Sequence, residues 1–173
     1  MREVLGGVLV VILLMAGCGD GSSAPPTLTA AQEAELSARA LADVCSRLCG
    51  DRTIYVRDQI LTMGTPSANA PEMPAAVKAA VESELPDARF VTSEEAAGLL
   101  DQEGGVDGGD GILLFVGPVE VLTAGGDVIG VDVSTLTSRE AGWGGTIQFR
   151  WTGATWELAS SEDTGVTVTS WVT

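Results

Sequence analysis

The chain of 173 residues is long enough for one domain of ordinary size, and its 45% hydrophobic and 19% charged residues can bury enough apolar surface to exclude global disorder. It carries 24 acidic against 9 basic residues, a formal net charge of -15. Because the basic residues are scattered rather than clustered, we expect no nucleic-acid partner. The sequence has no histidine, which excludes histidine-based catalytic triads and a histidine pH switch.

The N-terminal residues are typical of an export signal. An apolar run at residues 4–15 is shorter than the ~20 residues of a membrane-spanning helix and is followed by small residues and Cys18. The stretch Met15-Ala16-Gly17-Cys18 resembles the lipobox of bacterial lipoproteins. The resemblance implies a signal peptide at residues 1–17 that is removed, and a lipidated, palmitate-bearing Cys18. A short buried helix with a core cysteine is the alternative.

Residues 18–28 are expected to form the lipidated cysteine and a flexible tether, since they are rich in Gly, Ser and Pro. Residues 29–173 then form a single extracytoplasmic domain. On this interpretation the protein is held at the cell membrane, on its extracytoplasmic face, by its lipid anchor.

The two remaining cysteines, Cys45 and Cys49, lie four residues apart and favour a disulfide in an oxidising compartment. Side chains at this spacing on a regular helix are too far apart for a bridge, so the helix must distort or end there, and Gly50 is a suitable residue to end it. Two reduced thiols or a redox pair are the alternatives. We expect no metal site, because two thiolates fall short of the four ligands zinc requires.

Helices are predicted in the first half of the domain. The capping-box pattern Thr29-x-x-Gln32 and apolar residues at four-residue spacing predict an amphipathic helix over residues 30–49. A loop at residues 63–73 leads to a second helix, with Pro74 in its first turn and Pro86 after its end. Ser93 is predicted to cap a third helix at residues 94–100.

Strands are predicted around and after these helices, at residues 53–57, 88–91, 112–116, 119–123, 128–136, 146–151, 155–159 and 166–172. Turns at residues 124–127 and 152–153 suit hairpins, so the strands are expected to form an antiparallel meander. The expected fold class is therefore α+β, with two or three helices packed on one face of that sheet.

Few residues stand out as functional. Packing in the core or in a hairpin is the preferred explanation for the tryptophans; Trp143, in a segment expected to be a glycine-rich loop, is the best candidate for the alternative, an exposed aromatic binding residue. Trp151 and Trp156 flank a tight hairpin and are expected to be cross-strand neighbours. The acidic, glycine-rich segment 101–111 departs from calcium-loop spacing and is interpreted as a solvated loop.

These observations lead us to expect a membrane-anchored, non-enzymatic accessory or binding domain that needs no cofactor and contacts an envelope protein. The alternatives are a histidine-independent enzyme using carboxylates, Tyr55 or arginines, and a carrier of a small apolar ligand with a site between helices and sheet. The carrier requires an apolar cavity of about 300 Å³ or more.

Overall fold

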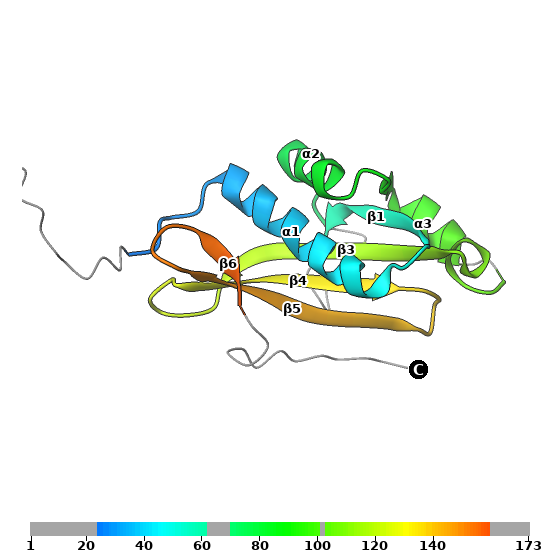
Figure 1. The fold of residues 1–173 in the computed structure, drawn as a ribbon. Coiled ribbons are helices and arrows are strands. Elements are labelled where there is room, and N and C mark those ends of the chain that lie inside the picture. Colours follow the sequence, from blue (N-terminus) through cyan, green and yellow to red (C-terminus); the bar gives the residue numbers. More distant parts are fainter. Residues whose placement is uncertain (1–23, 62–69, 101–102, 160–173) are drawn as a thin grey trace, which may run out of the picture.

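The structure is a computed structural model that describes residues 24–61, 70–100 and 103–159. These residues form an α+β fold of three α-helices, a short 3₁₀ helix and one six-stranded sheet (Figure 1). The elements in chain order are α1 (Ala30–Leu48), β1 (Thr53–Ile60), α2 (Ala75–Glu84), β2 (Arg89–Val91), α3 (Ser93–Leu100), η2 (Val106–Gly109), β3 (Gly111–Val121), β4 (Val128–Leu136), β5 (Gly142–Trp151) and β6 (Trp156–Leu158).

The sheet is mixed, with strand order β2-β1-β3-β4-β5-β6. Strands β3 to β6 are antiparallel neighbours, as the sequence predicts, whereas β1 runs parallel to both β2 and β3. The prediction of a purely antiparallel meander was therefore wrong for the first half of the domain. Helix α2 lies in the connection between β1 and β2 and returns the chain to the end of the sheet at which β1 begins. Strand β2 therefore runs in the same direction as β1.

Helices lie on both faces of the sheet, so the expectation of one helical face was also wrong. Core residues of α1 and α2 pack with Val56 and Leu114, whereas Ala96 of α3 packs with Tyr55 and Leu113 in a second cluster. Successive strand residues point to opposite faces, which places the two clusters on opposite sides of the sheet. Figure 1 shows α1 and α2 together above the strands.

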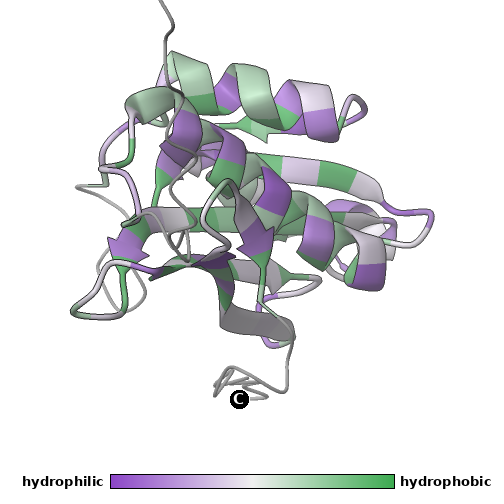
Figure 2. Cartoon of the chain, turned by 60° about the vertical axis from the view of Figure 1, so that its left-hand side comes forward, coloured by the Kyte–Doolittle hydropathy of each residue, from purple (hydrophilic) through white to green (hydrophobic). Residues whose placement is uncertain are grey.

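Helix α1 agrees with its prediction at both ends. Thr29 and Gln32 form the reciprocal capping box, and Gly50, with a φ of 56°, follows the C-cap residue Cys49. Its buried residues repeat at helical spacing, and in Figure 2 the turns of the helix carry both hydrophilic and hydrophobic residues. Burial of one side of the helix thus explains why it forms where it does.

The starts of α2 and α3 differ slightly from the predictions. Pro74 is the N-cap of α2 rather than a residue of its first turn. Thr92, not Ser93, caps α3: its hydroxyl accepts from the backbone N–H of Glu95, and the Glu95 carboxylate accepts from Thr92 in return. Ser93 is occupied elsewhere, since its hydroxyl bonds Gln59 and Arg57.

Two predicted strands merge and another lengthens. Residues 112–116 and 119–123 belong to the single strand β3, whose pairing with β4 shifts between Val116 and Val119. Strand β5 starts at Gly142, because Gly142 to Gly145 continue the antiparallel pairing with β4. The predicted strand 166–172 lies outside the described residues.

Candidate functional site

A cavity of about 360 Å³ opens at the end of the sheet where the described chain begins. Its walls come from the segment before α1, from the first turn of α1, from β3, β4 and the turn between them, and from β6. The lining residues are Pro25, Pro26, Thr27, Leu28, Glu33, Val119, Val121, Gly125, Gly126, Ile129 and Trp156. Figure 1 shows the N-terminal segment, the β3–β4 turn and β6 together at this end of the molecule.

The β3–β4 turn forms one wall of the cavity and is built as the sequence predicts. Leu122 and Val128 close the turn through a backbone hydrogen bond of 2.9 Å, and Gly126 takes a φ of 72°. The Thr123 hydroxyl donates to Asp127 over 2.6 Å, and this hydrogen bond is the main reason that the pKa of Asp127 is lowered. These contacts fix the turn against which the N-terminal segment packs.

The N-terminal segment forms the opposite wall without being part of a helix or strand. Pro25 Cγ lies 3.5 Å from the position that a Cβ on Gly126 would occupy, which is an ordinary van der Waals distance, so the two segments lie side by side. Leu28 packs against the main hydrophobic core. The wall is therefore held by side-chain packing at both ends.

Trp156 is the aromatic residue among those that line the cavity. As predicted, it pairs across the β5–β6 hairpin with Trp151, with ring centroids 5.5 Å apart and planes inclined at 55°. Its side chain is buried, and among the described residues its indole N–H has no hydrogen-bond acceptor. An unsatisfied buried donor costs about 1–3 kcal/mol, so this nitrogen needs an explanation.

Trp156 also borders a second, smaller hollow. This hollow of about 100 Å³ is lined by α1 and by the β5–β6 hairpin, including Arg39 and Trp151. Trp156 thus contributes to the lining of both hollows.

The larger cavity is mainly apolar and lacks positive charge. Val119, Val121, Ile129 and Leu28 supply aliphatic surface, and Glu33 is the only charged residue among the lining side chains. At its mouth Val121 is 63% exposed, an unusual degree for a strand valine. A neutral apolar molecule fits this lining better than an anion does.

Trp143, the binding residue proposed from sequence, does not join this site. It lies in β5 opposite Thr135, not in a loop, and packs partly buried against the core. The guanidinium of Arg47 lies 5.9 Å from its ring centroid. The expectation of a glycine-rich loop was wrong because the glycines allow close packing within the sheet, and a binding role for Trp143 stays a prediction.

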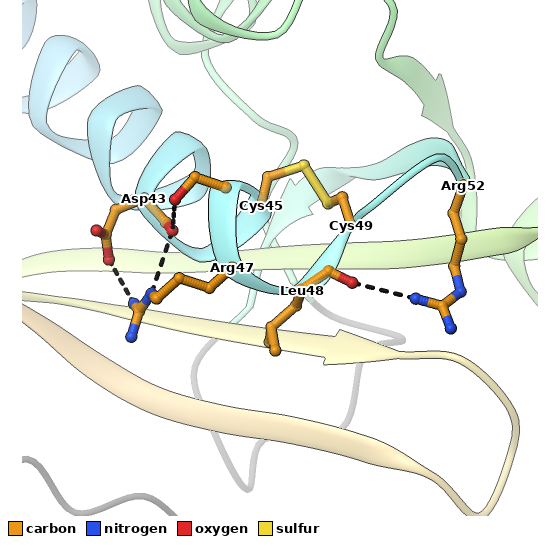
Figure 3. Close-up of a disulfide and its surroundings, with 7 residues drawn as sticks. Asp43, Cys45, Arg47, Leu48, Cys49 and Arg52 are labelled. Atoms are coloured by element: carbon orange, nitrogen blue, oxygen red, sulfur yellow. Dashed lines mark hydrogen bonds and ion pairs between the residues drawn. A yellow bond between two sulfur atoms is a disulfide. The ribbon is translucent and has the colours of Figure 1, made fainter.

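Cys45 and Cys49 are joined by a disulfide at the end of α1, with Cα atoms 4.7 Å apart (Figure 3). The backbone N–H of Cys49 still bonds the carbonyl of Cys45, so the bridge forms on the last helical turn. Both residues are buried in the main core, whereas Arg47 and Arg52 bond exposed groups of the same turn. The cysteines are therefore a structural feature distant in sequence from the cavity walls.

A second polar cluster lies at the amino ends of the parallel strands. The hydroxyl of Tyr55 donates a partly buried hydrogen bond to a carboxylate oxygen of Asp107 over 2.7 Å, and Asp107 has a φ of 51°. This hydrogen bond, followed by burial, raises the pKa of Tyr55. The segment expected to be a solvated loop is instead anchored here, since Val106 is fully buried and η2 forms beside it.

Arg57 is a buried cation at the carboxyl end of β1. Its guanidinium bonds the neutral side chains of Gln59 and Ser93, while Nε has no acceptor in the described chain. Burial lowers the pKa of Arg57, and the neighbouring Asp58 partly opposes this effect. The described residues contain no group of three or more histidine, cysteine or acidic side chains that could hold a metal ion.

Comparison with protein-family models, with curated proteins and with solved structures finds no match for this chain. No helix among residues 24–61, 70–100 and 103–159 is both long and apolar enough to span a membrane. The expected signal segment and Cys18 lie outside the described residues. Interpretation of the site therefore depends on its own chemistry.

Sequence reasoning did not identify the cavity. Its lining residues come from the N-terminal segment and the first turn of α1, from the β3–β4 hairpin and from β6, and none of these parts forms a recognisable motif. The one available signal was Trp156 beside a tight hairpin, which indicated packing with Trp151 but not a missing hydrogen bond. A carrier of small apolar ligands requires an apolar cavity, but the sequence did not indicate where in the domain such a cavity would lie.

Proposed function

We propose that this chain is a membrane-anchored extracytoplasmic lipoprotein whose domain binds a ligand or an envelope component and catalyses no reaction of its own. The proposal is supported at the N-terminus by the lipobox-like residues ending at Cys18. It is supported in the domain by the apolar cavity beside Trp156, which is the observation that carries the binding function.

The cavity favours a carrier of small apolar molecules over a purely protein-binding accessory domain. Its volume of about 360 Å³ exceeds the lower bound of about 300 Å³ that such ligands require. Its opening, beside Val121 and Pro25, lies at the end of the domain from which the chain leads towards Cys18. A ligand taken from the membrane surface would thus meet the cavity first.

The alternative of a histidine-independent enzyme has one supporting observation, the partly buried hydrogen bond between Tyr55 and Asp107. The pKa of Tyr55 is raised, so the phenol stays protonated at neutral pH and cannot act as a general base there. We therefore interpret the pair as an anchor that holds η2 against the sheet.

Metabolic labelling tests the anchor. Cells that express the full chain are fed an alkyne analogue of palmitate, and we expect the label on the wild type and its loss in Cys18→Ser. A Cys45→Ser/Cys49→Ser variant is the matched control and keeps the label. Label that persists without Cys18 contradicts the lipoprotein assignment.

Chemical crosslinking on intact cells, with Cys18→Ser as the control, tests the binding role. A captured protein that disappears with the anchor supports an envelope partner. If no protein is captured, the result favours binding of a small ligand in the cavity.

A further inference from the structure

We propose that the outer edge of β5 is covered by a segment of the same chain, residues 166–172, which pairs antiparallel with it as a seventh strand. The pairing closes a sheet edge to which a strand of another protein could otherwise add. It depends neither on the cavity nor on the lipid anchor.

Strand β5 has a long edge that no described strand covers. Strand β6 pairs with β5 only at residues 149–151, so residues 142–147 have no neighbour on their outer side among the described strands. Figure 1 shows β5 continuing well beyond β6. Residues 142–147 pair with β4 without a bulge and include no charged residue and no proline, the features that usually protect an edge. This edge is therefore suited to pairing with a further strand.

The backbone of this edge directs hydrogen-bonding groups away from β4. The carbonyl of Gln148 accepts from the N–H of Ala159 on the outer side. Because the direction alternates along an antiparallel strand, the N–H and C=O groups of the other even-numbered residues also point outward. These residues are Gly142, Gly144 and Thr146.

Gly144 supplies the observation that this edge needs a cover. The residue is buried, yet its outward N–H and C=O have no partner among residues 24–61, 70–100 and 103–159. Buried backbone groups are nearly always hydrogen-bonded, because an unpaired one loses its bonds to water without replacement. A strand along the edge supplies partners for both groups.

Residues 166–172 have the sequence of a strand of the right length. They read Val-Thr-Val-Thr-Ser-Trp-Val, and all except Ser170 are β-branched or aromatic, the types that favour strands. An extended segment of this length spans about the same distance as residues 142–147. The outer edge of β6 is only three residues long and would pair less than half of the segment.

The chain runs along this edge in the required direction. Strand β6 is antiparallel to β5, and the bond between Ala159 and Gln148 lies next to the uncovered residues. Residues 160–165, Ser-Ser-Glu-Asp-Thr-Gly, are rich in turn-forming residues. So short a connection gives the segment an effective concentration on the order of millimolar at the edge, which favours it over a separate chain.

The two faces of β5 determine how the segment lies. Ile147 and Phe149 belong to the main core, so the odd-numbered residues of β5 face α1. The even-numbered residues of the segment, three of which are valines, belong on the same face because apolar surface is buried there. The odd-numbered residues, Thr167 and Thr169 among them, then direct their backbone N–H groups at β5.

Hydrogen exchange of single amides, followed by NMR, tests the pairing. The full chain carrying Cys18→Ser is compared with the same chain ended after Ala159. We expect the amides of Gly144 and Thr146 to exchange at least about tenfold more slowly in the full chain. The amide of Ile147 faces β4 and should stay protected in both, which shows that the shortened chain is folded. Equal exchange of Gly144 and Thr146 in the two chains overturns the proposal.

Two neighbouring prolines give matched variants that keep the full chain. Thr169→Pro removes an N–H assigned to β5, whereas Ser170→Pro removes one that points to solvent, where an edge strand tolerates proline. Thr169→Pro should accelerate exchange at Gly144 and Thr146, and Ser170→Pro should leave it slow. Equal exchange in the two variants contradicts the assigned pairing.

A dilution series identifies the strand that covers the edge. Pairing within one chain gives exchange rates at Gly144 that do not depend on protein concentration. Slower exchange at higher concentration would show that a second copy covers the edge, and this result would overturn the proposal.

Discussion

The guanidinium of Arg39 in α1 donates a hydrogen bond to the backbone carbonyl of Trp156 in β6, with 3.0 Å between Nη1 and the oxygen. The same guanidinium lies 5.2 Å from the ring centroid of Phe149 in β5. One side chain thus connects the first helix to the last two described strands and holds the backbone of Trp156, a residue of the cavity lining.

Replacement of Arg39 is expected to destabilise the domain. Arg39→Ala removes a charge-assisted hydrogen bond and a cation–π contact and should lower the free energy of unfolding by about 1.5–3 kcal/mol. Urea denaturation measures the change. Glu35→Ala is the control, since Glu35 and Arg39 form an exposed ion pair at 3.8 Å that should contribute less than about 1 kcal/mol. Equal effects of the two variants would show that the Glu35–Arg39 ion pair within α1, and not the hydrogen bond to the Trp156 carbonyl, accounts for the loss of stability.

Reduction of the disulfide should lower the free energy of unfolding by a modest amount. Cys45 and Cys49 close a very short loop, for which the chain-entropy relation gives about 2 kcal/mol. In a Cys18→Ser background, thiol titration of native protein should find no reactive cysteine, and a reductant should lower the urea midpoint. A Cys45→Ala/Cys49→Ala variant should show no response to the reductant. Two titratable thiols in the untreated native protein would exclude the bridge.

The capping pair at α3 predicts a measurable pKa change. Hydrogen bonds from the backbone and hydroxyl of Thr92 lower the pKa of Glu95. Thr92→Ala should therefore raise this pKa towards its ordinary value, while Thr29→Ala, at the equivalent position of α1, should leave it unchanged. NMR titration of the Glu95 carboxyl follows both variants.

The same pair sets a pH dependence of stability with a defined sign. A lowered pKa in the folded protein stabilises the fold above the ordinary pKa of glutamate, and this contribution is lost as pH falls through the lowered value. Thr92→Ala should narrow the difference in unfolding free energy between neutral and acidic pH. If the unfolding free energy of Thr92→Ala depends on pH as strongly as that of the wild type, the hydrogen bond between Thr92 and Glu95 is not the cause of the dependence.

Tyr55 predicts a loss of stability at alkaline pH. Its pKa is raised, mainly by the hydrogen bond to Asp107, so its contribution is fully present below the ordinary tyrosine pKa and is lost as pH rises through the raised value. Denaturation across this alkaline range should show a steeper decline for the wild type than for Tyr55→Phe.

Asp107→Asn is the companion variant, because asparagine tolerates the positive φ and keeps an acceptor but removes the charge. Ultraviolet titration of the phenol should show its pKa moving back towards the ordinary value. An unchanged titration would show that the negative charge of Asp107 does not contribute to the raised pKa of Tyr55.

Much of the fold could be predicted from the sequence, because local patterns decide it. The capping box at Thr29, the apolar spacing along α1 and the glycine after Cys49 define a helix without reference to its neighbours. The hairpin turns before β4 and β6 are equally local, since Gly126 and Gly153 supply the positive φ that they require.

Strand direction and the face on which each helix packs could not be predicted in this way. Parallel pairing of β1 with β2 and β3 depends on contacts between residues distant in sequence. The alternation in β1 that places Val56 and Tyr55 on opposite faces is visible in the sequence, but which helix covers each residue is not.

The sequence by itself determined the acidic charge, the absence of histidine, the signal-like start, the capping of α1 and the position of the hairpin turns, because each depends on composition or on neighbouring residues. Only the tertiary structure decided that β3, β4, β6 and the segment before α1 enclose an apolar cavity, and that the Trp156 indole there lacks an acceptor. A cavity and an unsatisfied donor are properties of groups brought together by folding. No local pattern of residues encodes them.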